Sequence, residues 1–173
     1  NHAPLAFNDL AATAEDASVN VPVLDNDTDE DGDTLAVSAF TQGANGSVTL
    51  NLDGTLNYTP ALNFNGSDSF SYEVSDGLLP SVGTVVVSVT PVNDAPIGAD
   101  DTATTDEDAA VILNVLANDS DVDGGALSVH SVTQGAHGAV IVHADGSVAY
   151  LPEPNFNGND AFTYKVSDGL DGM

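Results

Sequence analysis

The sequence is one unit written twice. Residues 1–78 superpose on residues 93–170 at a constant offset of 92 positions without a gap, and about half of the paired residues are identical. A repeat of this length restricts the chain to a fold that about 90 residues can form by themselves and then repeat. We therefore expect two domains, residues 1–92 and residues 93–173.

Each unit alternates apolar and polar residues with a period of two. Phe70, Tyr72 and Val74 share one face of a predicted strand, and the segment AFTYKVS at 161–167 repeats the pattern. Alternation of this kind predicts β-strands with one buried face. Further strands are expected in residues 4–14, 18–24, 35–40, 46–51, 55–59 and 82–89, with Asp-Gly and Asn-Gly turn signals between strands. No helical period is sustained, so the sequence predicts an all-β chain of two tandem immunoglobulin/cadherin-like antiparallel β-sandwiches of about seven strands each.

The second unit stops early. The counterpart of the strand at 82–89 would begin just past Met173, so the second sandwich is expected to lack its last strand and to leave an open edge near Tyr164. Two explanations stay open. Either the chain is an excised fragment, or a neighbouring molecule supplies the missing strand by β-pairing, which would give self-association through the open edge.

The charge of the chain selects its partners. It has 27 acidic residues, a single basic residue, Lys165, and a formal net charge of −26 at pH 7, yet apolar residues make up 42% of it. The apolar content predicts a packed core. Such a surface repels phosphate and anionic lipid, which excludes nucleic acid as a partner. No apolar run reaches the ~20 residues of a membrane span, so we expect no direct membrane insertion. Cations remain as partners because they neutralise the self-repulsion.

An acidic motif occurs once in each unit. Residues 27–32 read D-T-D-E-D-G and residues 119–124 read D-S-D-V-D-G. Alternate carboxylates on a tightly turning loop converge on one centre, and Ca²⁺ takes 6 to 8 oxygen ligands in flexible geometry, so this pattern favours calcium over magnesium. The motif is not an EF-hand, because the twelfth position holds Ser38 or His130 and not Glu. The alternative is a solvated acidic turn that binds no ion.

Strand order brings further candidate ligands to the same end. In an up-and-down order, the loops after the second and sixth strands lie beside the first residues of a unit. In the second unit this places Asp168 and the linker residues Asn93 and Asp94 near the acidic motif, and Asp76 is the counterpart of Asp168 in the first unit. For Asp76 the alternative is a turn cap made by its own side chain.

The opposite end of the first unit carries Glu15 and Asp68, and turn capping is again the alternative for Asp68. We expect this end to meet the second unit across the linker, where bound calcium would fix the joint. The predicted metal ligands are Asp27, Asp29, Asp31, Asp76, Glu15, Asp68, Asn93, Asp94, Asp119, Asp121, Asp123 and Asp168.

Both units carry the motifs N-x-A-P, E-D, N-D-x-D-x-D-G, Y-x-P, N-F-N-G and F-x-Y-x-V-S-D-G in the same order. This set resembles the bacterial cadherin-like repeats of large secreted RTX-type surface adhesins, also grouped as VCBS or tandem Ig-like repeats. The resemblance implies a calcium-rigidified spacer at the bacterial cell surface, used in adhesion and biofilm formation. It implies neighbouring repeats as partners, and cell-surface or matrix polysaccharide as a further one.

A polysaccharide-binding module of the cadherin-like type is the main alternative, although the chain has no Trp to form an aromatic shelf. His130, His137 and His143 are a weak case for zinc, because their counterparts are Ser and Asn. Without a catalytic motif or a cleft for paired carboxylates, we predict that the chain is not an enzyme.

Overall fold

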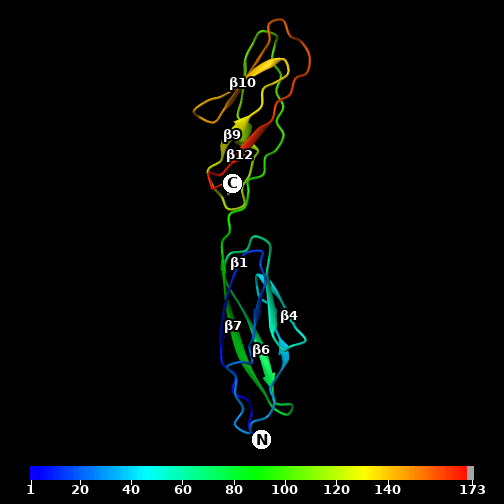
Figure 1. The fold of residues 1–173 in the computed structure, drawn as a ribbon, viewed down its shortest axis with the longest axis vertical. Helices are drawn as coiled ribbons and strands as arrows, with labels where there is room; N and C mark the ends of the chain where they lie inside the picture. The colour runs from blue at the N-terminus through cyan, green and yellow to red at the C-terminus, as the bar shows by residue number, and fades with distance from the viewer. Residues whose placement is uncertain (171–173) are drawn as a thin grey trace. The chain divides into compact units, whose positions relative to one another are not determined.

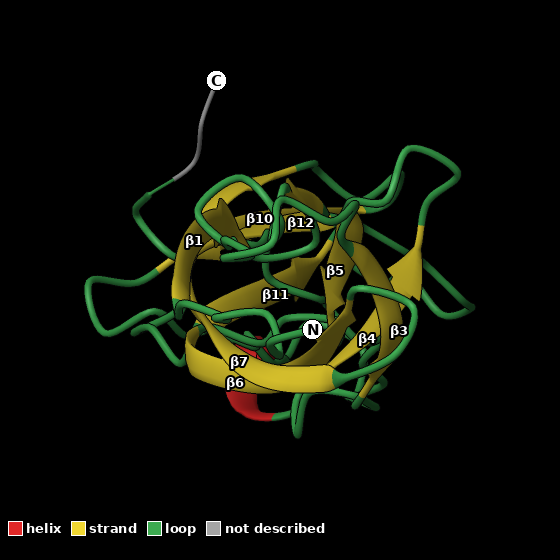
Figure 2. Ribbon diagram, turned by 90° about the horizontal axis from the view of Figure 1, so that it is seen from below, coloured by secondary structure: helices red, strands yellow, loops and turns green. Residues whose placement is uncertain are grey.

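The computed structural model describes residues 1–170 and divides into two compact units, Asn1–Val92 and Asn93–Met173. Figure 1 shows that each unit is built from strands and connecting loops. Strands and loops make up almost all of the described chain, with one short 3₁₀ turn, η1 (Val115–Ala117), drawn in red in Figure 2. The predicted all-β fold class is confirmed.

Unit 1 is a complete sandwich of two sheets. One sheet has the strand order β1-β7-β6-β3 and the other has the order β2-β5-β4. Pairing is antiparallel throughout except between β1 and β7, which run parallel, so the strand order is not simply up and down. The strands are β1 (Asp9–Ala14), β2 (Val19–Val21), β3 (Ala36–Phe40), β4 (Gly46–Leu50), β5 (Leu56–Pro60), β6 (Gly66–Ser75) and β7 (Pro80–Thr90).

The hairpin of β6 and β7 forms the centre of the first sheet. Its two strands pair over their whole length, from Gly66 opposite Val89 to Ser75 opposite Pro80. The alternation seen in the sequence puts Tyr72 and its neighbours two residues away into the core. Gly83 lies opposite Tyr72, and a Cβ added there would lie 2.5 Å from the tyrosine ring. In the central hairpin, the large side chain of Tyr72 therefore packs against a glycine, which has no side chain.

The core of unit 1 lies between the two sheets. Tyr58 of β5 stacks on Phe70 of β6 with ring centroids 6.0 Å apart, and the inward residues of β7 complete the layer. The buried apolar residues are Val21, Val23, Val48, Leu56, Tyr58, Phe70, Tyr72, Val74, Val85, Val87 and Val89.

Unit 2 keeps one sheet and part of the other. The sheet β10-β11-β8 corresponds to β4-β5-β2, and the two-stranded sheet β12-β9 corresponds to β6-β3. Its buried core is smaller: Val115, Val140 and Val148. The strands are β8 (Val111–Leu113), β9 (Ser128–Val132), β10 (Gly138–Val142), β11 (Val148–Pro152) and β12 (Tyr164–Ser167).

Two segments of unit 2 have the sequence of a strand but do not form one. Residues 101–106, the counterpart of β1, are exposed coil, and residues 158–163, the counterpart of the first part of β6, are also irregular. In unit 1 the equivalent residues pair with β7. The counterpart of β7 would begin at residue 172, outside the described residues, so within residues 1–170 both segments lack the strand that would order them.

Candidate cation site in each unit

The acidic loop of unit 1 folds around one side chain. Asp29 Oδ1 accepts the amide N–H groups of Asp31 at 2.9 Å and of Asp33 at 3.3 Å. Gly32 supplies the left-handed residue that the turn needs, with φ of +77°. The spacing of alternate acids therefore shapes the loop, and its backbone wraps around Asp29.

Three carboxylates converge in this loop. Oxygen atoms of Asp29, Asp31 and Asp33 all lie within 4.8 Å of one another. The second oxygen of Asp29, Oδ2, is buried and has no hydrogen-bond partner among the described residues. A buried carboxylate oxygen without a partner, surrounded by like charge, is costly unless a cation shares it. The donor set fits a hard divalent cation.

The first residues of the unit close over the loop. The amide of His2 donates to Asp31 Oδ2 at 2.6 Å, with His2 Nδ1 3.1 Å from the same oxygen. Asn1 Nδ2 donates to Asp76 Oδ2 at 2.7 Å. Hydrogen bonds from the amides of residues 79 and 78, together with the one from Asn1, lower the pKa of Asp76 below its usual range. The structure therefore brings Asp76 and Asp31 to the same end of unit 1.

Unit 2 repeats the hydrogen bonds that close the loop, although among the described residues three converging carboxylates are found only in unit 1. Asp121 Oδ1 accepts the amide of Asp123 at 2.8 Å, and Asp123 Oδ2 accepts the amide of Asp94 at 2.7 Å. Asn93 Nδ2 donates to Asp168 Oδ2 at 2.7 Å. Asp121 Oδ2 is buried and, within residues 1–170, has no hydrogen-bond partner. The unsatisfied oxygen thus occurs at the same repeat position in both units.

The two loops differ by an exchange of charge. Asp33 of unit 1 has Gly125 as its counterpart, whereas His2 of unit 1 has Asp94. Asp94 therefore supplies in unit 2 a carboxylate from a different segment of the chain, whereas Glu30 of unit 1 has the uncharged Val122 as its counterpart.

The first acid of each motif contacts a tyrosine and not the other acids of its loop. Asp27 Oδ1 accepts the amide of Phe7 at 2.7 Å and lies 3.0 Å from the hydroxyl of Tyr72. In unit 2, Asp119 lies 2.9 Å from the hydroxyl of Tyr164. Burial, followed by the nearby carboxylates, raises the pKa of both tyrosines, so each stays a protonated donor. These first acids hold the loop to the tyrosine. Asp27 is not one of the three converging carboxylates of unit 1.

Asp68 and Glu15 lie elsewhere in unit 1. Asp68, 5% exposed, accepts the amides of Ala44 and Asn45 and the hydroxyl of Tyr58. It precedes Asp76 by eight residues along β6, which at roughly 3.3 Å per residue is about 25 Å. Glu15, 4% exposed, accepts the amide of Val92. Both are held by hydrogen bonds within unit 1.

Sequence reasoning missed Asp33 and His2 as parts of the site. The comparison of repeats retained only positions that recur, and Asp33 does not recur. A position-by-position comparison of the two units shows Asp33 against Gly125 and His2 against Asp94, and could have found both residues. Reasoning from the sequence also missed the tyrosine contacts, although Tyr72 and Asp27 both recur at the constant offset.

Comparison with known proteins identifies the family. The sequence model described as "Bacterial Ig domain" matches residues 1–90 and again residues 93–173. The chain belongs to the bacterial Ig domain family. Protein GAMETE EXPRESSED 2 of Arabidopsis thaliana is 38% identical over 73 residues, which are 42% of this bacterial Ig chain and 8% of that protein. The match thus spans less than a tenth of the curated relative.

One solved structure supports the fold. Human protocadherin-24 EC1-2 matches with a TM-score of 0.54 at 18% identity, covering 96% of this chain and 94% of that one. An endo-fucoidan hydrolase of glycoside hydrolase family 107 matches with a TM-score of 0.43 at 24% identity, over 97% of this chain and 27% of the hydrolase. The first likeness shows a cadherin-like fold, and the second is too weak to carry an argument. Within residues 1–170 no helix is long and apolar enough to cross a membrane.

Proposed function

We propose that each bacterial Ig unit binds Ca²⁺ at its acidic loop and that the chain is a structural spacer of an extracellular bacterial adhesin. The observation that carries the proposal is the buried, unpartnered carboxylate oxygen of Asp29, repeated at Asp121. Two loops in different sequence surroundings leave the same oxygen unsatisfied, which is what a shared cation would require.

The choice of calcium follows from the donors. In unit 1 the cluster offers carboxylate oxygens of Asp29, Asp31 and Asp33, and a chain without cysteine has no thiolate ligand. Carboxylate and carbonyl oxygen suit Ca²⁺ and Mg²⁺. A loop with a glycine turn and mixed donors is flexible, which favours the larger ion, because Mg²⁺ demands near-ideal octahedral geometry. In unit 2, Asp94, Asp121, Asp123 and Asp168 would be the corresponding ligands.

Calcium would act on this chain by removing repulsion. The net charge of −26 on the chain opposes folding into a compact state, and the repulsion is strongest where carboxylates lie close together. In unit 2 the segment that closes the site, Asn93 and Asp94, directly follows Val92, the last residue of unit 1. Ordering that segment shortens the free connection between repeats. This suits a spacer whose partners are calcium and neighbouring repeats, and family membership supports a place at the cell surface. We assign the chain no catalytic step.

Calcium titration tests the proposal. For a ligand that binds only the folded state, a free concentration of about 100 times Kd adds about 2.7 kcal/mol, which for a domain of this size raises Tm by several degrees or more. Isothermal titration of the chelator-treated chain should give saturable binding, with magnesium much weaker.

Matched variants locate the ion. Asp29→Asn with Asp121→Asn should abolish the rise in Tm. Asp25→Asn with Glu107→Gln removes the same charge at two exposed residues outside the clusters and should keep the rise. A Tm that is unchanged by calcium in the metal-free parent would refute the site. Calcium-independent retention on one insoluble polysaccharide would instead favour a carbohydrate-binding module.

A further inference from the structure

Strand β4 is an edge of its sheet in unit 1, and β10 is the corresponding edge in unit 2. The opposite edges of these two sheets, β2 and β8, are only three residues long, whereas β4 and β10 each have five. An edge strand presents N–H and C=O groups that can pair with another chain, and short edge strands limit such pairing. β4 and β10 are therefore the edges at which a second molecule has the most backbone to pair with.

The register of β4 shows which of its backbone groups face outward. The carbonyl of Asn45 accepts the amide of Ala61, so the residues at odd positions along β4 bond to β5. In an antiparallel pair the intervening residues direct their N–H and C=O groups to the other side. Three residues therefore turn these groups towards the open edge: Gly46, Val48 and Leu50.

A glutamine side chain occupies the middle of this edge. Val48 donates its amide to Gln42 Oε1 at 2.7 Å, and Gln42 Nε2 donates to the carbonyl of Val48 at 3.0 Å. In an antiparallel sheet, a residue of a neighbouring strand would exchange the same two bonds with Val48. The side-chain amide of Gln42 thus takes the place of one residue of a partner strand.

Unit 2 repeats both bonds at the same distances. Val140 donates its amide to Gln134 Oε1 at 2.7 Å, and Gln134 Nε2 donates to the carbonyl of Val140 at 3.0 Å. The chain has only these two glutamines, Gln42 and Gln134, and they occupy the same repeat position. Both glutamines of the chain are therefore used to close an edge strand.

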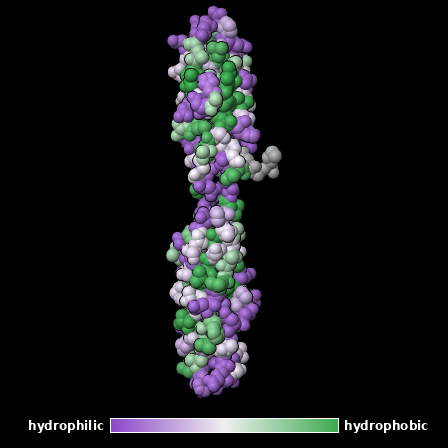
Figure 3. Space-filling model, turned by 90° about the vertical axis from the view of Figure 1, so that its left-hand side faces the viewer, coloured by the Kyte–Doolittle hydropathy of each residue, from purple (hydrophilic) through white to green (hydrophobic). Residues whose placement is uncertain are grey.

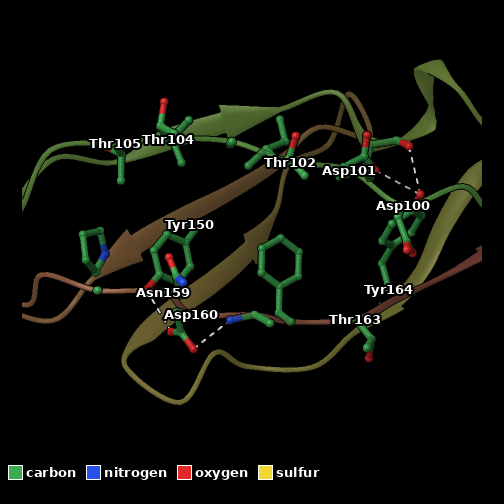
Figure 4. A pocket seen from close by; sticks show the side chains of 18 of the residues that line it. Asp100, Asp101, Thr102, Thr104, Thr105, Tyr150, Asn159, Asp160, Thr163 and Tyr164 are labelled. Atoms are coloured by element: carbon green, nitrogen blue, oxygen red, sulfur yellow. Dashed lines mark hydrogen bonds between the residues drawn. The ribbon is translucent and has the colours of Figure 1, made fainter.

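A carboxylate holds the loop that carries each glutamine. Asp160 accepts the amides of Ala136 and His137 at 2.9 Å and lies beside Tyr150, whose hydroxyl donates to it at 2.8 Å (Figure 4). Asp68 makes the equivalent bonds in unit 1. The loop is thus fixed immediately after the glutamine, which lowers the entropy lost when the glutamine side chain binds the edge.

The charge of the chain does not protect these edges. β4 reads GSVTL and β10 reads GAVIV, so neither contains a charged residue, although the chain has 27 acidic residues. Leu50 and Ile141 are 45% and 56% exposed, and Figure 3 shows hydrophobic side chains in green among the hydrophilic ones. Uncharged segments of high β-propensity without proline are those that pair between molecules. Protection at β4 and β10 must therefore come from another source than charge.

We propose that Gln42 and Gln134 are edge caps, autoinhibitory contacts that keep β4 and β10 from pairing with the same strand of a second copy. Without its cap, β4 pairs antiparallel with β4 of the second copy, with Val48 opposite Val48. This register restores both bonds that Gln42 now makes, and its two-fold symmetry closes the assembly as a dimer. The edge caps act independently of any cation at the acidic loops.

Removal of the caps tests the proposal. Gln42→Ala opens one edge per chain, and in sedimentation it should dimerise at concentrations at least about tenfold below any at which the parent associates, because each Val48 regains two bonds. Gln42→Ala with Gln134→Ala opens two edges and should form larger assemblies than either single variant. Asn57→Ala removes a side-chain amide from the central strand β5 and should associate no more than the parent.

Hydrogen exchange of the Val48 amide reports on the edge directly. In dilute Gln42→Ala this amide should exchange at least about tenfold faster than in the parent, because it has lost its acceptor. It should become protected again at concentrations where dimers form. The Val140 amide should keep its rate in Gln42→Ala and exchange faster in Gln134→Ala, so each unit is the control for the other and repeats the test if one variant does not fold.

Cross-linking checks the register, because the chain has no cysteine of its own. With Val48 opposite Val48, Ser47 of one copy lies opposite Thr49 of the other, as a non-hydrogen-bonded pair close enough for a disulfide. In the Gln42→Ala background, a mixture of Ser47→Cys and Thr49→Cys chains should form the mixed disulfide faster than either chain links to itself. Equal rates of linking, association no stronger than in the parent, or unchanged exchange at Val48 would each overturn the proposal.

Discussion

At the scale of single residues, the best satisfied acid in each unit has a structural role. Asp68 accepts four hydrogen bonds, from the amides of Ala44, Asn45 and Ser69 and from the hydroxyl of Tyr58. Burial alone would raise the pKa of Asp68, but these hydrogen bonds outweigh it and hold the pKa below the usual range. The carboxylate thereby ties the loop before β4 to both sheets.

Asp68→Asn should destabilise unit 1 by about 2 kcal/mol, because an amide nitrogen would replace one oxygen that accepts charge-assisted bonds. Urea denaturation followed by the NMR resonances of Tyr58 measures the change. Asp25→Asn, at an exposed carboxylate, should stay within about 0.5 kcal/mol of the parent. Equal stability of the two variants would show that the Asp68 bonds are not what holds the loop.

The counterpart in unit 2, Asp160, predicts a dependence on pH. Burial raises its pKa, but bonds from His137, Tyr150 and two further amides outweigh burial and lower the pKa to about 2. Because the unfolded value is about 3.9, the stability that Asp160 contributes is present above about pH 4 and is lost as pH falls towards 2.

The comparison is between the parent and Asp160→Asn, followed by the resonances of Tyr150 from pH 6 to pH 2. The parent should be more stable at pH 6, and the difference should shrink as pH falls. A difference that stays constant over this range would contradict the assigned pKa.

The candidate site shows where residue-level reasoning from sequence stops. The spacing of alternate acids singled out Asp29 and Asp31, which the structure brings together. The same spacing gave no means of separating them from Asp27, because the choice depends on Tyr72 lying beneath one end of the loop. Contacts between residues 45 positions apart are set by the packing of the sheets, which no local pattern contains.

At the scale of elements, β7 organises the unit. In the first sheet of unit 1 it pairs with β1 on one side and with β6 on the other, and its inward residues fill part of the core. The sequence predicted its strand at 82–89 from alternation, and the observed strand is Pro80–Thr90. Its parallel pairing with β1 was not predictable, because alternation defines which face is buried but not which strand is adjacent.

Gly83→Ala should destabilise unit 1 by about 1–3 kcal/mol, since the new methyl group would overlap the ring of Tyr72 in a filled core. Val82→Ala, at a side chain 64% exposed on the outer face, is the matched control and should change stability by less than about 0.5 kcal/mol. Thermal or urea denaturation compares them. Similar effects from both substitutions would show that the close approach at Gly83 is relieved at no cost.

At the scale of the whole molecule, the two units have the same design but unequal cores. Among the described residues, unit 1 buries eleven apolar side chains and unit 2 buries three. Burial of apolar surface is the main favourable contribution to folding, so the units should differ in stability although their sequences are about half identical.

Urea denaturation of the whole chain should therefore show two transitions. The resonances of Tyr150 and Tyr164 should be lost at least about 1 M urea before those of Tyr58 and Tyr72, given m values of about 1–3 kcal/mol/M for small domains. The measurement is made in chelator, so that bound cations do not contribute. Coincident loss of all four tyrosines would contradict unequal stability.

The hydrogen bonds that close each candidate cation site have a consequence for how the chain is made. Asn1 meets Asp76, and Asn93 meets Asp168, across 75 positions of sequence in both cases. A polypeptide that emerges residue by residue, in either direction, presents both halves of such a site only when almost the entire unit is out. Cation binding at these loops would then stabilise a repeat that has emerged completely, whereas a partly emerged repeat could not form the site.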